Sequence, residues 1–174
     1  MITFIVGGHD SGKSAFAEEL ACKDVCKGKY YIATMTVADE DSARRRDKHV
    51  MMRDGKGFET LEIPYHIEVA PELMREPKDC VVLLECVANL VGNAMHDDEW
   101  KMRLHSPSEE TKDDFVFCVV RLVRMLADAV GHLIVVSLRC DEEDTKDEET
   151  ALYISLLEAV NARLSRIANN VYER

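Results

Sequence analysis

The amino-acid sequence predicts an α/β protein whose sheet is mainly parallel and is covered by helices on both faces. Apolar runs of strand length alternate with amphipathic segments along the 174 residues, which is the pattern of parallel α/β folds. The first run, Ile2–Val6, leads directly into the glycine-rich loop Gly7–Ser14. A later run, Cys80–Glu85, is apolar until its last residue, as expected of a buried parallel strand.

The composition indicates one domain, residues 1–174, with 47% hydrophobic and 32% charged residues. The net charge of −11 argues against a nucleic-acid partner, because phosphate backbones attract clustered lysines and arginines. It does not argue against a nucleotide, which one lysine and a ring of backbone amides can hold. The acidic excess lies mainly in 109–114 and 141–149, interpreted as solvated surface or a mobile loop.

The cysteines do not form a zinc-binding pattern. Cys22 and Cys26 lie four residues apart on an expected helix, and the sequence contains no C-x-x-C pair. Cys80, Cys86 and Cys118 lie among apolar residues and are interpreted as small core side chains. Since neither a leader peptide nor an apolar run of membrane-spanning length is visible, we expect a cytoplasmic protein without a membrane span.

Periodicity and turn residues predict the remaining elements in order. The expected helices cover residues 14–22, 41–53, 67–74, 87–95, 115–130 and 151–168. The expected strands cover residues 2–6, 30–34, 58–63, 80–85, 133–138 and a short segment at 171–174. Asp41 or Ser42 is expected to cap the charged second helix, and residues 96–108 are expected to be irregular.

The glycine-rich loop fits G-x-x-x-x-G-K-[ST], the P-loop pattern for binding nucleotide phosphates. Its glycines allow backbone N–H groups to surround an anion, which the following helix N-terminus also attracts. Lys13 is expected to reach the outer phosphates, and the Ser14 hydroxyl to bind Mg²⁺. The alternative, an ordinary glycine turn that caps a helix, does not explain Lys13 and Ser14. The predicted nucleotide-binding residues of the loop are Gly7, Gly8, His9, Asp10, Ser11, Gly12, Lys13 and Ser14.

Two further positions are expected beside this loop, because ligands of parallel α/β folds bind at the carboxyl ends of strands. Thr34 ends the second expected strand, and Glu85 ends the strand over 80–85. P-loop proteins place a Walker-B-type carboxylate near Mg²⁺ at such a position. We therefore predict Ser14 and Glu85 as metal-binding residues, with a strand-end acid that faces water as the alternative for Glu85.

A dense basic segment on the second expected helix contains His49. Arginines near a nucleotide can neutralise the charge of a transferring phosphoryl group, and a histidine can act as a base or as a covalent nucleophile. Considered alone, His49 would be interpreted as a solvated helix residue. The surrounding cations are Arg44, Arg45, Arg46, Lys48 and Arg53.

The motifs together resemble one family, the bifunctional adenosylcobinamide kinase / adenosylcobinamide-phosphate guanylyltransferases of cobalamin biosynthesis. The resemblance covers residues 2 to about 95 and is fainter beyond, around Val160–Val171. Arg46 takes the place of a family isoleucine and Phe58 that of a tryptophan. The motifs that carry the resemblance are G-G-x-x-S-G-K-S from Gly7, Y-I-A-T from Tyr31, Arg45-x-x-x-His49, Phe58-x-Thr60-x-Glu62-x-Pro64 and L-L-E-C from Leu83.

The resemblance implies a P-loop fold that binds ATP or GTP with Mg²⁺ and takes a small corrinoid substrate. It implies that a phosphoryl group first passes to the cobinamide hydroxyl. GTP then guanylylates His49, and the GMP passes to the phosphorylated cobinamide. Lys13 and His49 would be catalytic, and Arg45, Glu62 and Glu85 would lie near the nucleotide. By analogy with the family, a homo-oligomer is expected.

Two family motifs are missing from the second half of the chain. The family usually has T-N-E-x-G where this chain has Ser137–Asp141, and R-x-F-R-D where it has Ala151–Ser155. These differences leave two alternatives open. The chain could be a diverged nucleotide-binding protein without transferase activity, or a P-loop kinase for another small alcohol.

Overall fold

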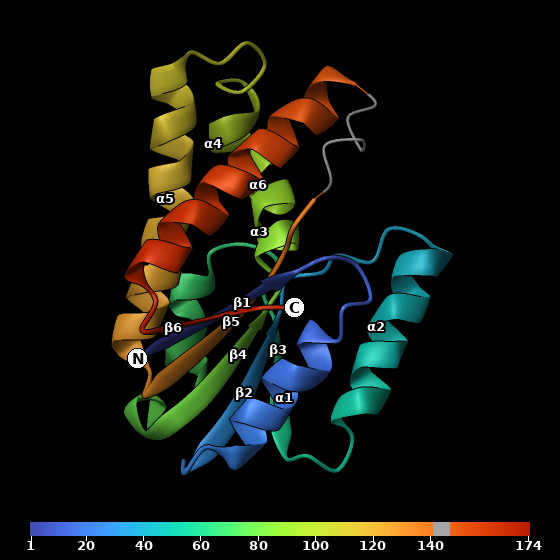
Figure 1. Ribbon diagram of the computed structural model, residues 1–174, viewed down its shortest axis with the longest axis vertical. Helices are drawn as coiled ribbons and strands as arrows, with labels where there is room; N and C mark the ends of the chain where they lie inside the picture. Colours follow the sequence, from blue (N-terminus) through green and yellow to red (C-terminus); the bar gives the residue numbers. More distant parts are fainter. Residues whose placement is uncertain (141–146) are drawn as a thin grey trace.

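The computed structural model describes residues 1–140 and 147–174, with a six-stranded sheet at its centre (Figure 1). The strand order is β3-β2-β4-β5-β1-β6, and every pair of neighbours is parallel. This confirms the predicted α/β class and the mainly parallel sheet. The strands are β1 (Ile2–Gly7), β2 (Gly28–Ala33), β3 (Phe58–Glu62), β4 (Cys80–Glu85), β5 (His132–Leu138) and β6 (Asn170–Glu173).

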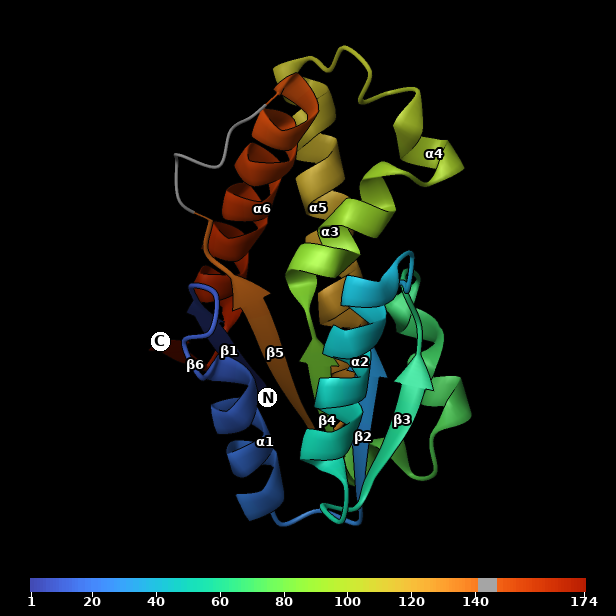
Figure 2. The same cartoon turned by 90° about the vertical axis from the view of Figure 1, so that its right-hand side faces the viewer.

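Helices cover both faces of the sheet, as Figures 1 and 2 show. One face carries α1 (Lys13–Lys23) and α2 (Glu40–Arg53). The other carries α3 (Val87–Met95), α5 (Glu109–Ala129) and α6 (Glu148–Ile167). The short segments are the 3-10 helices η1 (Ile67–Leu73) and η2 (Pro77–Asp79) and the one-turn helix α4 (Asp98–Lys101).

Alternation along the central strands divides the core into two layers. Tyr31 and Leu83 pack with Ala17 of α1, whereas their neighbours Tyr30 and Leu84 face the opposite side of the sheet. The opposite layer is the larger one, because three helices bury apolar residues there. Both layers exclude water almost completely, which fixes the register of the strands.

Several helix boundaries differ from the sequence-based expectation because polar caps extend the helices beyond their apolar stripes. Ser108 caps α5 by accepting a hydrogen bond from the Thr111 N–H, seven residues before the apolar stripe begins. Asp147 caps α6 in the same way, so 148 and 149 belong to a helix. The rest of the predicted acidic segment, 141–146, lies outside the described residues. Helix α2 is capped by Asp39, whereas Asp41 or Ser42 was expected.

The segment predicted to be irregular, 96–108, contains helix α4. Its Trp100 is 2% exposed and packs edge-on against Phe115 of α5, with 5.1 Å between the ring centroids. A helix of four residues is too short to show periodicity, so no pattern in the sequence indicates it. The segment predicted as a helix over 67–74 is the 3-10 helix η1, which contains Pro71.

Two glycines provide a matched test of the packing. A Cβ on Gly131 would lie 2.6 Å from the Lys78 carbonyl oxygen, whereas a Cβ on Gly92 would meet only Tyr153, at 3.8 Å. We expect Gly131→Ala to lower the free energy of unfolding by about 1–3 kcal/mol, because backbone must shift. Gly92→Ala, inside α3, should raise it by about 0.5–1 kcal/mol. Urea unfolding measures both; equal stability of the two variants would contradict this packing.

Candidate active site

The carboxyl ends of β1, β2, β3 and β4 meet at one edge of the sheet. Ala33 at the end of β2 is in register with Glu62 on one side and Glu85 on the other. The P-loop connects β1 to α1 at this edge, and Gly12 (φ 79°) is the N-cap of α1. This left-handed conformation suits glycine and turns the backbone into the helix. The strand, loop and helix order predicted from the sequence is therefore present.

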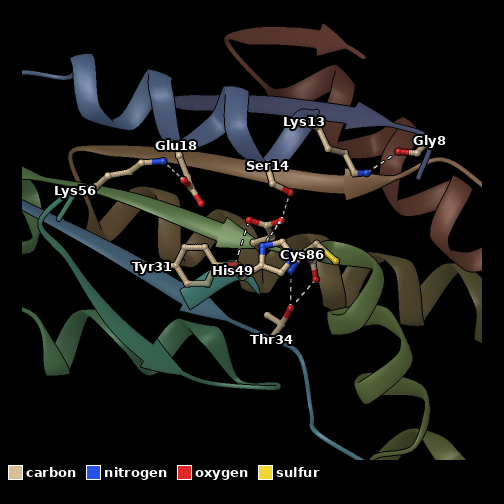
Figure 3. Close-up of polar contacts among 10 residues, drawn as sticks. Gly8, Lys13, Ser14, Glu18, Tyr31, Thr34, His49, Lys56 and Cys86 are labelled. Carbon is tan, nitrogen blue, oxygen red and sulfur yellow. Dashed lines mark hydrogen bonds and ion pairs between the residues drawn. The ribbon is translucent and has the colours of Figure 1, made fainter. Parts of the chain in front are cut away.

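The loop residues leave donors available for an anion. Lys13 lies across the loop, and its Nζ donates a hydrogen bond to the Gly8 carbonyl oxygen at 2.7 Å (Figure 3). An ammonium group has three donors, so this contact holds the side chain without using all of them. The Ser11 hydroxyl is buried and has no hydrogen-bond partner among the described residues. His9 and Asp10 are exposed at the tip of the loop.

Glu85 is the central side chain of the site. It is only 9% exposed, which excludes the alternative of a strand-end acid that faces water. Its Oε1 accepts a hydrogen bond from the Ser14 hydroxyl, and its Oε2 accepts one from the Tyr31 hydroxyl at 3.1 Å. Burial, together with the nearby Glu85 charge, raises the pKa of Tyr31 well above its usual range, so this phenol remains a donor.

His49 reaches the same carboxylate from helix α2. Its Nδ1 lies 3.7 Å from Glu85 Oε1, beyond hydrogen-bond distance, and has no hydrogen-bond partner within the described structure. The side chain is 24% exposed, so His49 is not the solvated helix residue that its charged surroundings suggest in isolation. Figure 3 shows the imidazole of His49 below Ser14.

A cavity of about 400 Å³ lies between α2 and the ends of β2, β3 and β4. Glu62 lines it, as does Arg46, which occupies the position of the family isoleucine. The Arg45 side chain, predicted near the nucleotide, lies outside the described atoms. The residues that line the cavity and carry polar groups are Tyr31, Thr36, Arg46, His49, Arg53, Glu62, Glu85, Cys86 and Asn89.

Thr34, predicted near the nucleotide, is not among the residues that line this cavity. It is fully buried, and its hydroxyl donates to the Cys86 carbonyl oxygen at 2.8 Å and accepts from the Cys86 N–H at 2.7 Å. Asn93 of α3 donates to the Thr34 carbonyl oxygen at 2.7 Å. These contacts fix the backbone that follows Glu85, so Thr34 positions the site.

An ion pair between a buried carboxylate and a partly exposed lysine connects α1 to the turn between α2 and β3. Glu18 is fully buried, and its Oε2 accepts a hydrogen bond from Lys56 Nζ at 2.5 Å (Figure 3). A buried carboxylate requires such a partner, because its desolvation is otherwise uncompensated. The pair joins the P-loop helix to the segment that carries His49. No sequence pattern indicates this pair, since both residues resemble ordinary surface charges.

The oxygens of Ser14 and Glu85 fit Mg²⁺. Both are hard donors, and they already lie in contact beside the P-loop. Within 1–140 and 147–174, no group of three His, Cys, Asp or Glu side chains is placed to hold a metal. The arrangement therefore suits an ion that arrives with nucleotide phosphates and retains water ligands, which is how Mg²⁺ commonly binds.

This fold and site define a P-loop nucleotide-binding α/β protein. The chain belongs to the cobinamide kinase / cobinamide phosphate guanyltransferase family, which matches residues 3–173. The match extends well past residue 95, although the resemblance of individual sequence motifs weakens beyond that residue. Membership and the P-loop together indicate use of a nucleoside triphosphate.

Individual relatives agree with this assignment. The chain is 34% identical, over 107 residues, to the bifunctional adenosylcobalamin biosynthesis protein CobU of Escherichia coli (strain K12). The aligned part covers 58% of this chain and 57% of that protein. A solved structure of an ATPase domain has a TM-score of 0.55 at 11% identity, covering 99% of this chain and 68% of the other. That likeness shows the fold alone.

None of the helices in the described part of the chain combines the length and apolar character that a bilayer crossing requires.

The Thr34 contacts give a test of how the site is positioned. Thr34→Val keeps the side-chain shape but leaves the Cys86 N–H and C=O without these partners. We expect the free energy of unfolding to fall by about 1–3 kcal/mol, because buried polar groups lose hydrogen bonds. Thr60→Val, at an exposed position of β3, is the control and should be nearly neutral. Chemical unfolding followed by circular dichroism measures the difference; a neutral Thr34→Val would exclude the positioning role.

Proposed function

We propose that the protein is a cobalamin biosynthesis enzyme with two activities. It phosphorylates adenosylcobinamide with ATP or GTP, and it then transfers GMP from GTP to the product, giving adenosylcobinamide-GDP. The observation that carries this proposal is the position of His49, which lines the cavity and lies 3.7 Å from the P-loop carboxylate Glu85. Family membership supports the pairing of the two activities.

In the first reaction the P-loop holds the triphosphate, with Lys13 beside the outer phosphates. The hydroxyl oxygen of the cobinamide aminopropanol arm attacks the γ-phosphorus and releases a proton. The bond from the γ-phosphorus to the bridging oxygen breaks, and a nucleoside diphosphate leaves. Such reactions depend on positioning and on neutralising charge, which Lys13 and the loop amides can provide.

In the second reaction a ring nitrogen of His49 attacks the α-phosphorus of GTP. A nitrogen–phosphorus bond forms, the bond to the β-phosphate oxygen breaks, and pyrophosphate leaves with the electron pair. A phosphate oxygen of the phosphorylated cobinamide then attacks the same phosphorus, which releases GMP from His49. The covalent intermediate divides one difficult transfer into two displacements. Glu85 lies close enough to orient the imidazole electrostatically.

Ser14 and Glu85 would hold Mg²⁺ in both reactions. When bound, this ion would offset negative charge on the phosphates. The carboxylate is kept in place by Tyr31, and Ser14 is fixed at the start of α1. Glu62 and Arg46 would line the cavity where the base or the corrinoid arm enters.

A second candidate, a nucleotide-binding protein without transferase activity, is favoured by the residues that replace the missing family motifs. Ser137 is buried and donates to Asn161 Oδ1 at 2.6 Å, so it serves the core. Tyr153 of α6 donates to the Ala88 carbonyl oxygen at 3.2 Å, again a packing role. Binding of GTP without turnover of adenosylcobinamide would support this candidate. Turnover of a different alcohol would instead indicate a P-loop kinase of another specificity.

Labelling with GTP tests the proposed intermediate. We expect GTP labelled in the α-phosphate to leave an acid-labile label on the wild-type protein, because His49 forms a phosphoramidate. His49→Ala should lose essentially all of the label.

The control variant is His105→Ala, which changes an exposed histidine outside the cavity and should label as the wild type does. GTP labelled in the γ-phosphate should leave the protein unlabelled. Equal labelling of the wild type and His49→Ala would refute the guanylyltransferase activity.

A further inference from the structure

We infer that Arg53 forms an anion subsite for the α-phosphoryl group of the nucleotide, next to His49. This inference rests on the proposed function and names one residue that the reaction would require. It follows from the burial of Arg53, from the nitrogens it leaves free and from its place on α2.

Arg53 is held in a fixed orientation inside the cavity. Its guanidinium carbon lies 3.4 Å from the centroid of the Tyr31 ring, so the planar group stacks on the phenol. The Tyr31 hydroxyl in turn donates to Glu85. Arg53, Tyr31 and Glu85 therefore form one connected row along the cavity that His49 also lines. His49 and Arg53 are four residues apart on α2, which places them on the same face of the helix.

The guanidinium is buried and its hydrogen-bonding capacity is largely unused. Arg53 is 7% exposed, and its Nε and Nη1 atoms have no partner among the described residues. Arginine is almost never buried without a partner, because desolvating a charge is costly unless an opposite charge compensates it. Although Arg53 ends α2, neither of these nitrogens binds the last carbonyls of the helix. The free N–H groups therefore point to an anion that binds in the cavity.

The neighbouring histidine indicates which anion this is. A phosphoryl group bonded to His49 carries oxygens within the reach of a side chain one helical turn away. A guanidinium can bind two such phosphoryl oxygens at once. The outer phosphates are expected at the P-loop, beside Lys13. We therefore assign Arg53 to the α-phosphate, where it would neutralise charge while the nitrogen–phosphorus bond forms.

A pair of ligands tests the subsite without any turnover. GMP has the α-phosphate and guanosine lacks it. By calorimetry we expect the wild type to bind GMP at least tenfold more tightly than guanosine, and Arg53→Met to bind both equally. Methionine retains volume over the Tyr31 ring without the charge. Arg44→Gln is the matched control on α2, because Arg44 is 74% exposed and pairs with Glu40 and Asp41; it should keep the wild-type preference.

Kinetics of His49 labelling give an independent measure. With saturating α-labelled GTP, Arg53→Met should lower the labelling rate constant by about a hundredfold, as loss of one transition-state donor typically does. Arg53→Lys keeps the charge but loses the planar pair of donors, so its labelling rate constant should lie between those of the wild type and Arg53→Met. The thermal midpoint of unliganded Arg53→Met should not decrease, because the variant removes an unpaired buried charge. GMP should raise the thermal midpoint of Arg53→Met by less than it raises that of the wild type.

Each contrary result has a distinct meaning. A lower midpoint of unliganded Arg53→Met with an unchanged GMP preference would make Arg53 structural and overturn the inference. Wild-type labelling combined with a raised KM for the phosphorylated acceptor would assign Arg53 to the acceptor phosphate, and would also overturn it. A wild type that is not labelled would defeat the proposed function. Even if the wild type is not labelled, tighter binding of GMP than of guanosine that is lost in Arg53→Met would support the anion subsite. Equal binding of GMP and guanosine by the wild type would reject the subsite.

Discussion

The hydrogen bonds to the Glu85 carboxylate connect the parts of this site. Glu85 ends β4, Ser14 lies in the first turn of α1 and Tyr31 lies in β2, so one buried side chain joins three elements. Hydrogen bonds to an ionised acceptor are stronger than neutral ones, and a buried carboxylate needs them to compensate its lost hydration. The site geometry consequently depends on the register of β4 against β2, which places Glu85 opposite Ala33.

Much of the fold follows from the sequence, because apolar runs and loop chemistry are local signals. The run Cys80–Glu85 and the loop before Lys13 each indicate their own structure. The order of the strands does not follow, since parallel pairing depends on contacts between distant segments. Helix α4 also leaves no pattern, because Trp100 is fixed by packing against Phe115 and not by periodicity. Helix starts are misplaced where a cap such as Ser108 lies several residues before the apolar stripe.

For the site, as for the fold, local sequence signals can be predicted and contacts between distant segments cannot. Motif spacing predicts the loop residues and His49 as site residues, and a run that ends in an acid predicts Glu85. The structure places Ser14, His49 and Glu85 side by side. Tyr31 and Arg53 are missed as partners, because their contact joins a strand to a helix 22 residues later along the chain. One signal was present, namely the four-residue spacing of His49 and Arg53. Thr34 stays a predicted nucleotide neighbour, and its hydroxyl is bonded to the backbone of Cys86.

Helix α2 carries the proposed nucleophile yet contributes little to the core. Only Ser42 and Arg53 are buried among its described side chains, whereas α5 buries eight. Stability and chemistry consequently rest on different segments of the chain. Substitutions on the cavity-lining side of α2 can alter the reacting groups with little change to the apolar packing that keeps the protein folded. Such a division gives evolution a helix on which catalytic residues can be exchanged while the sheet and its other helices remain intact.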